Sequence, residues 1–417
     1  MNLCYTGYRA IYSGELSQES SARTAGEPSG SGTIRLLTSA FEKPVLSLTR
    51  RALMAGMFAT ACGRKRAARY QGWLLVASGA ERAVAVANLA QFKRVTTIPL
   101  PHVPDQLFLA GNRVFVTSRE GAELIEIDTA GFRVSGRIAL PGKPVGATLL
   151  QGNLFLAAMD EPAGLAVVDL TTGRVSGKTG LPAAPVAADI SSGVVAMTLA
   201  GRNSIIRIAS PNLKIMGETE AGAPCGPIRF RNDGKTILAG IPSTREIITV
   251  DARTGEILAK LPLPISPLRF CFNGDGGQMF VTGTGEDSLA IVNAYQNEID
   301  QTILAGRTPG AMAVSRSKNL LFVANTASGD LTILDIDTRH LSASVHVGGQ
   351  PGEVLLTPDG EYALVVDPVS GSVSVARITT VLDHAQVALI AQPPKPLFTV
   401  FQTATDARSA IIVPFET

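Results

Sequence analysis

A short apolar run recurs along this chain at an almost constant interval, and this repetition restricts the fold more than any other feature. Between residues 321 and 360 the repeating unit contains four short runs rich in Leu, Ile and Val, separated by Gly, Asn, Asp and Pro. Apolar and polar residues that alternate between such turn signals predict β-strands. The first run of each unit begins 40 to 43 residues after the previous one, at Trp73, Val114, Leu154, Val194, Ile237, Met279, Leu321 and Tyr362.

A period of about forty residues with four strands per unit predicts an all-β fold, the β-propeller, in which four-stranded blades cover each other's faces. The first unit lacks an innermost strand, and the last run of the chain, Ser409–Val413, is left over. We therefore expect this run to complete the first blade and close the ring, which removes exposed sheet edges. This count gives eight blades, and seven is the alternative if the first or last unit is not a true blade. The other innermost strands are predicted to begin near Asp105, Val145, Val186, Ile228, Leu268, Gly310 and Gly352.

The pattern LFVAN…LTILDIDT…VGGQPGEVLLTPDG in residues 321–360 resembles the repeats of the YVTN family of bacterial β-propellers. The resemblance covers roughly residues 72–417 and is strongest at Leu321–Gly360 and Met279–Val314. It implies a propeller scaffold, often of seven blades in that family. It implies little about activity, because many unrelated functions use the same scaffold.

The residues before the repeats contain a segment that resembles a bacterial lipoprotein export signal. Arg50 and Arg51 precede a ten-residue apolar run, Ala52–Ala61, and Cys62 follows this run. The run is too short for a membrane span, which needs about twenty residues. We therefore predict a signal peptide at 45–62, export to the periplasm or the outer surface of the cell envelope, and a lipid anchor on Cys62. The alternative is a fortuitous apolar stretch before the domain.

The predicted signal divides the chain into four parts. Residues 1–44 are rich in Ser, Gly and Glu, and we expect them to be disordered or, if translation starts near Val45, untranslated. Residues 63–71 form a short basic tether, and residues 72–417 form a single propeller domain.

Composition excludes some partners. The net charge of +2 gives no general attraction to nucleic acid or to an anionic membrane, and we expect a monomer that meets a membrane only through its lipid anchor. The two cysteines within the repeats, Cys225 and Cys271, lie six residues apart when their blades are aligned on Pro227 and Pro267. This offset is about 20 Å along a strand, against the roughly 6 Å that separates bridged Cα atoms. We predict that both are free thiols.

Arginines on the innermost strands give the candidate ligand-binding site. Arg229 and Arg269 occupy the same position in adjacent blades, second after the leading proline, where small or apolar residues are usual. A cluster of guanidinium groups suits a carboxylate or a phosphate at the mouth of the channel. The alternative is that these arginines pair with acidic residues and fill the channel. The remaining candidates are Arg202 and Arg245 on connections of the same sector, Arg307 on the following connection, and Arg231, Asp189 and Glu353 on innermost strands.

Catalytic and metal signatures do not hold up. The sequence GKT at 234–236 follows Arg229 instead of the glycine of a phosphate-binding loop, and Gly283-Thr284-Gly285 lacks the third glycine of a dinucleotide motif. The four histidines are scattered over different blades, so we predict no metal, haem or other cofactor. Aspartates at the turns are expected to cap those turns through their own side chains instead of binding calcium: Asp128, Asp169, Asp233, Asp251, Asp275, Asp335 and Asp359.

Three functions follow in order of preference. The first is a non-catalytic binding or scaffold protein whose partner is a small anionic ligand or an envelope protein. The second is a lactonase-like hydrolase, for which Asp189, Glu353 and the arginines are the candidates for the chemistry. The third, binding of single-stranded nucleic acid, is disfavoured because no exposed aromatic residues are interleaved with the basic ones.

Overall fold

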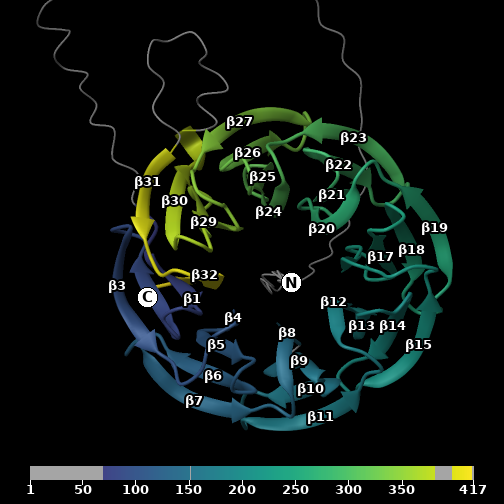
Figure 1. The fold of residues 1–417 in the computed structure, drawn as a ribbon, viewed down its shortest axis with the longest axis horizontal. Coiled ribbons are helices and arrows are strands. Elements are labelled where there is room, and N and C mark those ends of the chain that lie inside the picture. The colour runs from purple at the N-terminus through teal and green to yellow at the C-terminus, as the bar shows by residue number, and fades with distance from the viewer. Residues whose placement is uncertain (1–68, 151, 381–396, 416–417) are drawn as a thin grey trace, which may run out of the picture. The chain divides into compact units, whose positions relative to one another are not determined.

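The computed structural model describes residues 69–150, 152–380 and 397–415. In these residues 32 strands form eight four-stranded antiparallel sheets, which are arranged as blades around one axis (Figure 1). The eight-bladed β-propeller predicted from the repeat is therefore confirmed, and the seven-bladed alternative is wrong. No helix in the described part is long and apolar enough to cross a membrane.

Each blade contains, from the axis outward, an A, a B, a C and a D strand, and blades are numbered along the chain. Blade 1 contains β32 (Ala407–Pro414), β1 (Gly72–Ser78), β2 (Ala83–Asn88) and β3 (Lys93–Pro99), and blade 2 contains β4 (Gln106–Ala110), β5 (Arg113–Ser118), β6 (Glu123–Asp128) and β7 (Arg133–Ala139). Blade 3 contains β8 (Lys143–Leu149), β9 (Leu154–Glu161), β10 (Ala163–Asp169) and β11 (Arg174–Gly180), and blade 4 contains β12 (Pro185–Ser191), β13 (Val194–Leu199), β14 (Ser204–Ala209) and β15 (Lys214–Glu220).

Blades 5 to 8 follow the same order. Blade 5 contains β16 (Ile228–Phe230), β17 (Thr236–Ile241), β18 (Glu246–Asp251) and β19 (Ile257–Pro262), and blade 6 contains β20 (Ser266–Phe272), β21 (Gln278–Thr284), β22 (Ser288–Asn293) and β23 (Glu298–Leu304). Blade 7 contains β24 (Pro309–Ser315), β25 (Leu320–Asn325), β26 (Asp330–Asp335) and β27 (His340–His346), and blade 8 contains β28 (Glu353–Leu356), β29 (Tyr362–Val366), β30 (Ser372–Arg377) and β31 (Leu397–Gln402).

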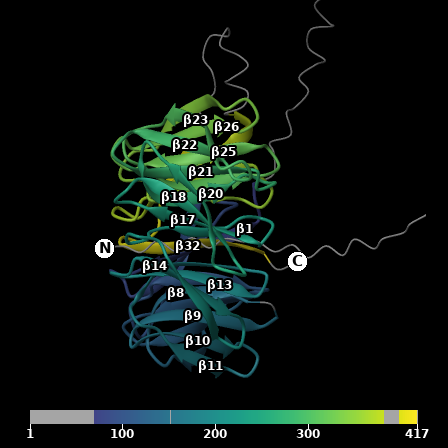
Figure 2. The ribbon, with the colours of Figure 1, turned by 90° about the vertical axis from the view of Figure 1, so that its right-hand side faces the viewer.

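The ring closes as the leftover run predicts. Strand β32 pairs antiparallel with β1, from Gly72 opposite Pro414 to Ser78 opposite Ala407 (Figures 1 and 2). The chain therefore supplies the A strand of blade 1 from its C-terminal end and the other three strands from the start of the repeats. Because strands from both ends of the repeat array pair in one sheet, neither end leaves an unpaired strand edge.

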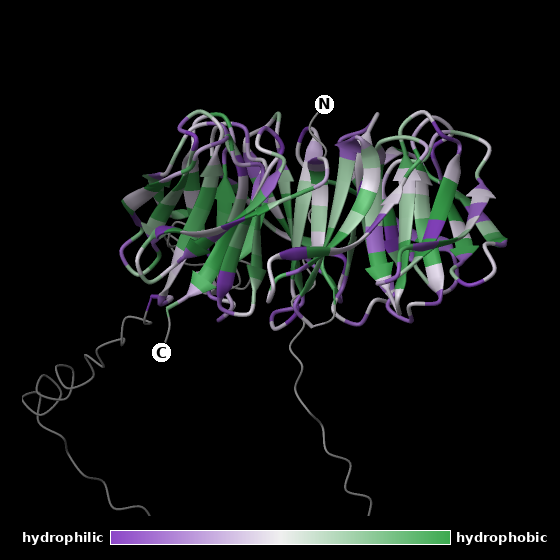
Figure 3. Ribbon diagram, turned by 90° about the horizontal axis from the view of Figure 1, so that it is seen from below, coloured by the Kyte–Doolittle hydropathy of each residue, from purple (hydrophilic) through white to green (hydrophobic). Residues whose placement is uncertain are grey.

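The hydrophobic core is divided among the contacts between blades. The B and C strands are almost continuous apolar runs, because neighbouring blades cover both of their faces, whereas D strands alternate between exposed and partly buried residues. Hydrophobic residues accordingly lie on the strands and hydrophilic residues gather in the loops (Figure 3). The buried residues form eight clusters, and each cluster joins two adjacent blades.

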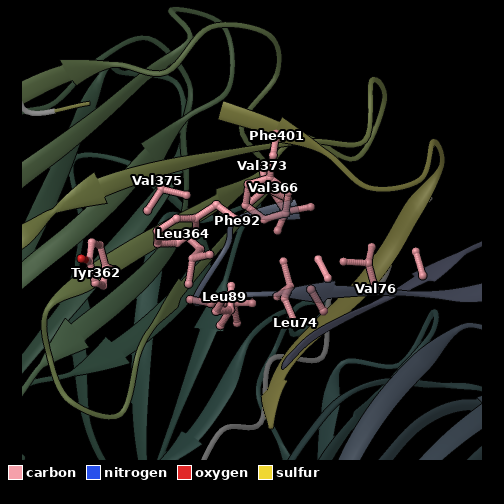
Figure 4. Packing of buried hydrophobic residues seen from close by; sticks show 14 of the residues in the cluster. Leu74, Val76, Leu89, Phe92, Tyr362, Leu364, Val366, Val373, Val375 and Phe401 are labelled. Carbon is pink, nitrogen blue, oxygen red and sulfur yellow. The ribbon is translucent and has the colours of Figure 1, made fainter. Parts of the chain in front are cut away.

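The cluster at the closure is as apolar as the others. Leu74 and Val76 of blade 1 pack with Tyr362, Leu364 and Val375 of blade 8 (Figure 4). All of these side chains are at most 2% exposed. Eight clusters for eight contacts between blades mean that no contact in the ring lacks a core. Closure is therefore stabilised by burial as well as by the hydrogen bonds of β32.

The turn aspartates cap their turns, as predicted. Asp251 is typical, since its Oδ1 accepts bonds from the amides of Arg253 at 2.9 Å and Thr254 at 2.7 Å. The other turn aspartates likewise accept backbone N–H bonds within their own turns: Asp128, Asp169, Asp233, Asp275, Asp335 and Asp359.

One buried arginine joins two blades on the side of these turns. Arg207 of β14 is 4% exposed. Its guanidinium donates to the backbone oxygens of Arg253 at 2.7 Å, Thr254 at 3.1 Å and Ala252 at 3.3 Å, all in the next blade. A Cβ on Gly255 would lie 2.2 Å from this guanidinium, so the glycine is needed for the close approach. Burial lowers the pKa of Arg207, with Asp251 opposing the shift.

Candidate functional site

The candidate site lies where blades 5 to 7 meet the axis of the ring. Arg229 and Arg269 occupy strands β16 and β20, the A strands of blades 5 and 6, and both are half-buried. In the register of their blades, Arg229 lies opposite Leu238 and Arg269 opposite Thr282. The structure thus places both arginines on the A strands of adjacent blades, but the prediction that they share one position is wrong. Arg229 pairs with the third residue of its B strand and Arg269 with the fifth, so Cys271 is the counterpart of Arg229 in blade 6.

A thiol lies close to these arginines. Burial raises the pKa of Cys271 to about 11, and the positive charge of Arg229 in the preceding blade opposes that rise. Arg229 therefore acts across the boundary between blades 5 and 6. Cys271 and Cys225 are both free thiols, which confirms the prediction made from their offset. Burial also raises the pKa of Cys225 to about 11, so neither thiol is an activated nucleophile.

The two acidic candidates on the inner wall bind backbone. One carboxylate oxygen of Asp189, on β12, accepts the amide of Phe230 on β16 at 2.7 Å, and the other accepts Ile190 N at 3.0 Å. Similarly, Glu353 on β28 accepts the amide of Ala410 on β32 at 3.0 Å. The edge of an A strand that faces the axis has no neighbouring strand, so the N–H groups on that edge need acceptors from elsewhere. The carboxylates of the preceding blade supply them.

Serine plays the same part between blades 1 and 2, where Ser409 Oγ lies 3.2 Å from the amide of Leu107. The same kind of contact therefore joins three pairs of neighbouring blades: a side-chain oxygen on one A strand accepts an amide of the next A strand. The sequence gives no signal for it, because the donor and acceptor lie 41, 57 and 302 positions apart in the chain.

Glu353 has a strongly perturbed pKa. Burial raises the pKa of this carboxyl to about 7, while the Ala410 amide and the charge of Arg269 oppose the rise. The influence of Arg269 means that these two side chains, from blades 6 and 8, share one electrostatic environment. A carboxyl with this pKa changes charge near neutral pH.

Arg269 itself has no carboxylate within ion-pair distance among the described residues, and the same holds for Arg202, Arg245 and Arg307. Arg202 and Arg245 are exposed on the B–C connections of blades 4 and 5. Arg245 donates to Pro264 O at 3.2 Å. These arginines are the cations that the structure leaves available in this sector.

Arg231 does not join them. It lies at the other end of β16, in the turn to β17 (Thr236–Ile241), where its guanidinium holds Asp233 at 2.5 and 2.9 Å. The same group donates to Ala294 O at 3.3 Å and lies 4.5 Å from the ring centre of Tyr295. Arg231 therefore ties blade 5 to blade 6 on the opposite face of the ring, which matches the structural alternative for this arginine.

A cleft of about 280 Å³, here called the mouth cleft, lies beside Arg245. Its lining comprises the end of β21, the B–C connection of blade 6 and the connection to blade 7: Gly283, Thr284, Gly285, Glu286, Asp287 and Thr308. Arg245 borders the cleft, because its Nη2 lies 3.5 Å from where a Cβ on Gly285 would be.

In the sequence, the start of this segment, Gly283-Thr284-Gly285, is only an incomplete dinucleotide motif. The glycines have other reasons. A Cβ on Gly283 would lie 1.9 Å from Ser266 O, and Gly285 has φ +108°, a conformation that side chains disfavour. Gly283, at one end of the mouth cleft, lies opposite Pro267, two residues before Arg269. The signal that could have revealed it is this pair of glycines at the end of a strand.

No cluster of three or more His, Cys, Asp or Glu suited to a metal ion occurs in the described residues. Cys62 and the rest of the predicted signal and tether up to residue 68 lie outside the described residues, as does the N-terminal extension 1–44.

Comparisons with known proteins support the fold alone. No family model matches the chain, and no curated protein matches it. Among solved structures, the dihydro-heme d1 dehydrogenase NirN in complex with DHE is similar with a TM-score of 0.64 and 12% identity, over 81% of this chain and 74% of that one. Hydrazine synthase of Kuenenia stuttgartiensis is similar with a TM-score of 0.53 and 18% identity, over 66% and 95%. At such identities the likeness shows a β-propeller fold alone.

Proposed function

We propose that this chain is a propeller that binds a small organic anion at the mouth of its ring, without chemistry of its own. The observation that carries the proposal is the gathering of arginines in this sector, with Arg229 and Arg269 on adjacent A strands, two residues out of register with each other. Arg269 and Arg245, together with Arg307, lack a carboxylate partner in the described residues, so their charge is available to a ligand. We also propose that the repeats are of the YVTN type, on the pattern at 321–360.

A thermal-shift assay on the full chain tests this function. Phosphate and acetate are expected to raise the melting temperature of the wild type, because a ligand that binds only the folded state stabilises it. The variant Arg269→Gln should lose most of that rise. Arg133→Gln, a substitution at the exposed start of β7 in blade 2, is the matched control and should keep it. An identical shift in Arg269→Gln, or no shift in the wild type, contradicts the proposal.

A hydrolase of the lactonase type is the second candidate, and one observation favours it. A carboxyl with a pKa of about 7, such as Glu353, is suited to proton transfer at neutral pH. Against it, the same carboxyl is engaged by the Ala410 amide as a backbone acceptor. Lactone hydrolysis by the wild type, lost in Glu353→Gln, would establish the enzyme. No turnover with or without added divalent metal removes it.

We further propose that the protein is exported and carries a lipid on Cys62. The support is the sequence of residues 45–62, with its twin arginine and apolar run before a cysteine. Expression with radiolabelled palmitate tests both parts of the proposal. The wild type should incorporate label and fractionate with membranes, Cys62→Ser should be exported without label, and Arg50→Lys/Arg51→Lys should remain in the cytoplasm. Labelling that survives Cys62→Ser would contradict the anchor.

A further inference from the structure

The lining of the mouth cleft is polar and carries both kinds of hydrogen-bonding group. Thr284 and Thr308 contribute hydroxyls, Glu286 and Asp287 contribute carboxylates, and all four residues are exposed. Asp287 uses one carboxylate oxygen for the amide of Thr308, at 3.0 Å, which joins the two connections that form the cleft. Carboxylates accept hydrogen bonds from hydroxyl groups, and threonine hydroxyls both donate and accept them. Such a lining suits a ligand rich in hydroxyls.

The cleft also has a cationic border. Arg245 lies beside Gly285 and forms no ion pair in the described part of the chain. Its guanidinium fork matches the geometry of a carboxylate, and such charge-assisted bonds are stronger than neutral ones. Glu286 and Asp287 would repel an anion placed against them, so the ligand's negative charge must lie at the arginine side and its hydroxyls at the acidic side.

The dimensions limit the ligand further. Small-molecule sites commonly have volumes of roughly 300 to 1,000 Å³, and the mouth cleft, at about 280 Å³, is at the lower end. It suits a single sugar ring better than an oligosaccharide. Gly285 is exposed and carries no side chain, so a ring can approach the backbone there beside Arg245.

We propose that the mouth cleft binds a monosaccharide carboxylate of the hexuronate class, with the carboxylate on Arg245 and the hydroxyls on Thr284, Glu286, Asp287 and Thr308. The inference rests on the proposed function, of which it specifies the ligand.

Calorimetric titration of the full chain with glucuronate, glucose and acetate tests the inference. Glucuronate should bind at least tenfold more tightly than either of the others, because only glucuronate uses both sides of the cleft. Arg245→Gln should reduce glucuronate to the affinity of glucose. Glu286→Gln should weaken glucose and glucuronate by a similar factor, about threefold, and should leave acetate unchanged.

The matched control is Arg82→Gln. Arg82 ends the B–C connection of blade 1 as Arg245 ends that of blade 5, with φ values of 47° and 55°, but it pairs with Glu120. Its removal should change no affinity. Two results would overturn the sugar-acid inference: glucuronate that binds no more tightly than acetate, or glucuronate that still binds more tightly than acetate and glucose in Arg245→Gln. The proposed function survives either result if acetate and phosphate bind through Arg269. If no anion binds, both are overturned.

Discussion

The acidic residues of the inner wall show how the role of one residue depends on its neighbours in space. In the sequence, Asp189 and Glu353 are candidate acid–base or ligand groups. In the structure each accepts an amide from the next A strand, at 2.7 and 3.0 Å. A carboxylate that satisfies an otherwise unpaired N–H at the axis stabilises the ring, because a buried unpaired donor costs about 1–3 kcal/mol. Burial makes the charged form of Glu353 less favourable, and this cost appears as its raised pKa.

Replacement of Glu353 by glutamine should change how stability depends on pH. The folded-state pKa of about 7 lies above the ordinary value of 4.5, so the native state binds more protons between these values and wild-type stability falls as pH rises from about 4.5 to 7. Glutamine keeps an acceptor for Ala410 without ionising. Glu353→Gln should therefore equal the wild type near pH 4 and exceed it by about 3 kcal/mol at pH 8.

Urea unfolding of both proteins at pH 4, 6 and 8 measures this difference. A Glu353→Gln variant whose stability relative to the wild type is the same at all three values would contradict the raised pKa. Asp359→Asn, at an exposed turn on the same blade, serves as a control for the general effect of losing a carboxylate.

Both thiols should be inert in the native state. Burial raises the pKa of Cys225 and Cys271 to about 11. Since the thiolate is the reactive form, only about 0.1% of each is reactive at pH 8, against roughly a quarter of an ordinary thiol. In a Cys4→Ser/Cys62→Ser background, iodoacetamide at pH 8 should leave both unlabelled over an hour, as followed by mass spectrometry, and label both in urea. Fast labelling without urea would refute this.

At the scale of elements, the blades are held to each other by groups that reach across from one sheet to the next. Arg207 of β14 binds three carbonyl oxygens of the turn between β18 and β19, and Gly255 leaves the space for its guanidinium. Arg231 does similar work between blades 5 and 6. These contacts involve turns whose own geometry is set locally by aspartates such as Asp251.

Loss of the Arg207 guanidinium should weaken the contact between blades 4 and 5. Arg207→Ala leaves three backbone carbonyls of the next blade without this donor, and we expect a loss of about 2–4 kcal/mol. Arg207→Lys should restore little of it, because an ammonium lacks the planar fork that spans the three oxygens. Urea midpoints measure both changes, and Arg133→Ala, which alters an exposed arginine, should stay within about 0.5 kcal/mol of the wild type. Equal midpoints for Arg207→Ala and Arg133→Ala would refute this role.

At the scale of the whole molecule, the ring depends on one strand from the end of the chain. Strand β32 completes blade 1, and its Ala410 and Ile411 belong to the clusters that blade 1 shares with blades 8 and 2. Trp73, the single tryptophan, lies at this closure, 4.6 Å from the ring of Phe415 and 5.0 Å from that of Phe132. Its fluorescence therefore reports on closure directly.

Truncation after residue 406 should open the ring. The variant loses the pairing of β32 and exposes the edge of β1, so we expect red-shifted Trp73 fluorescence, a melting temperature at least 10 °C lower and a tendency to aggregate. Truncation after Phe415 keeps β32 and is the control. A shortened chain with native fluorescence and an unchanged melting temperature would show that β32 is not needed for closure.

The sequence by itself determined the parts that depend on local pattern. The repeat predicted eight four-stranded blades, and the leftover run Ser409–Val413 predicted the closing strand, since strand period, turn residues and burial of both faces are all read from neighbouring positions. It also predicted that Arg229 and Arg269 lie on adjacent A strands, but aligning the blades on their prolines wrongly gave the two arginines one position. Only the tertiary structure decided which polar groups meet across blades. The amides that engage Asp189 and Glu353, the removal of Arg231 to the opposite face and the mouth cleft between two connections depend on the twist and radius of the closed ring. These contacts join residues tens to hundreds of positions apart, and no local periodicity encodes them.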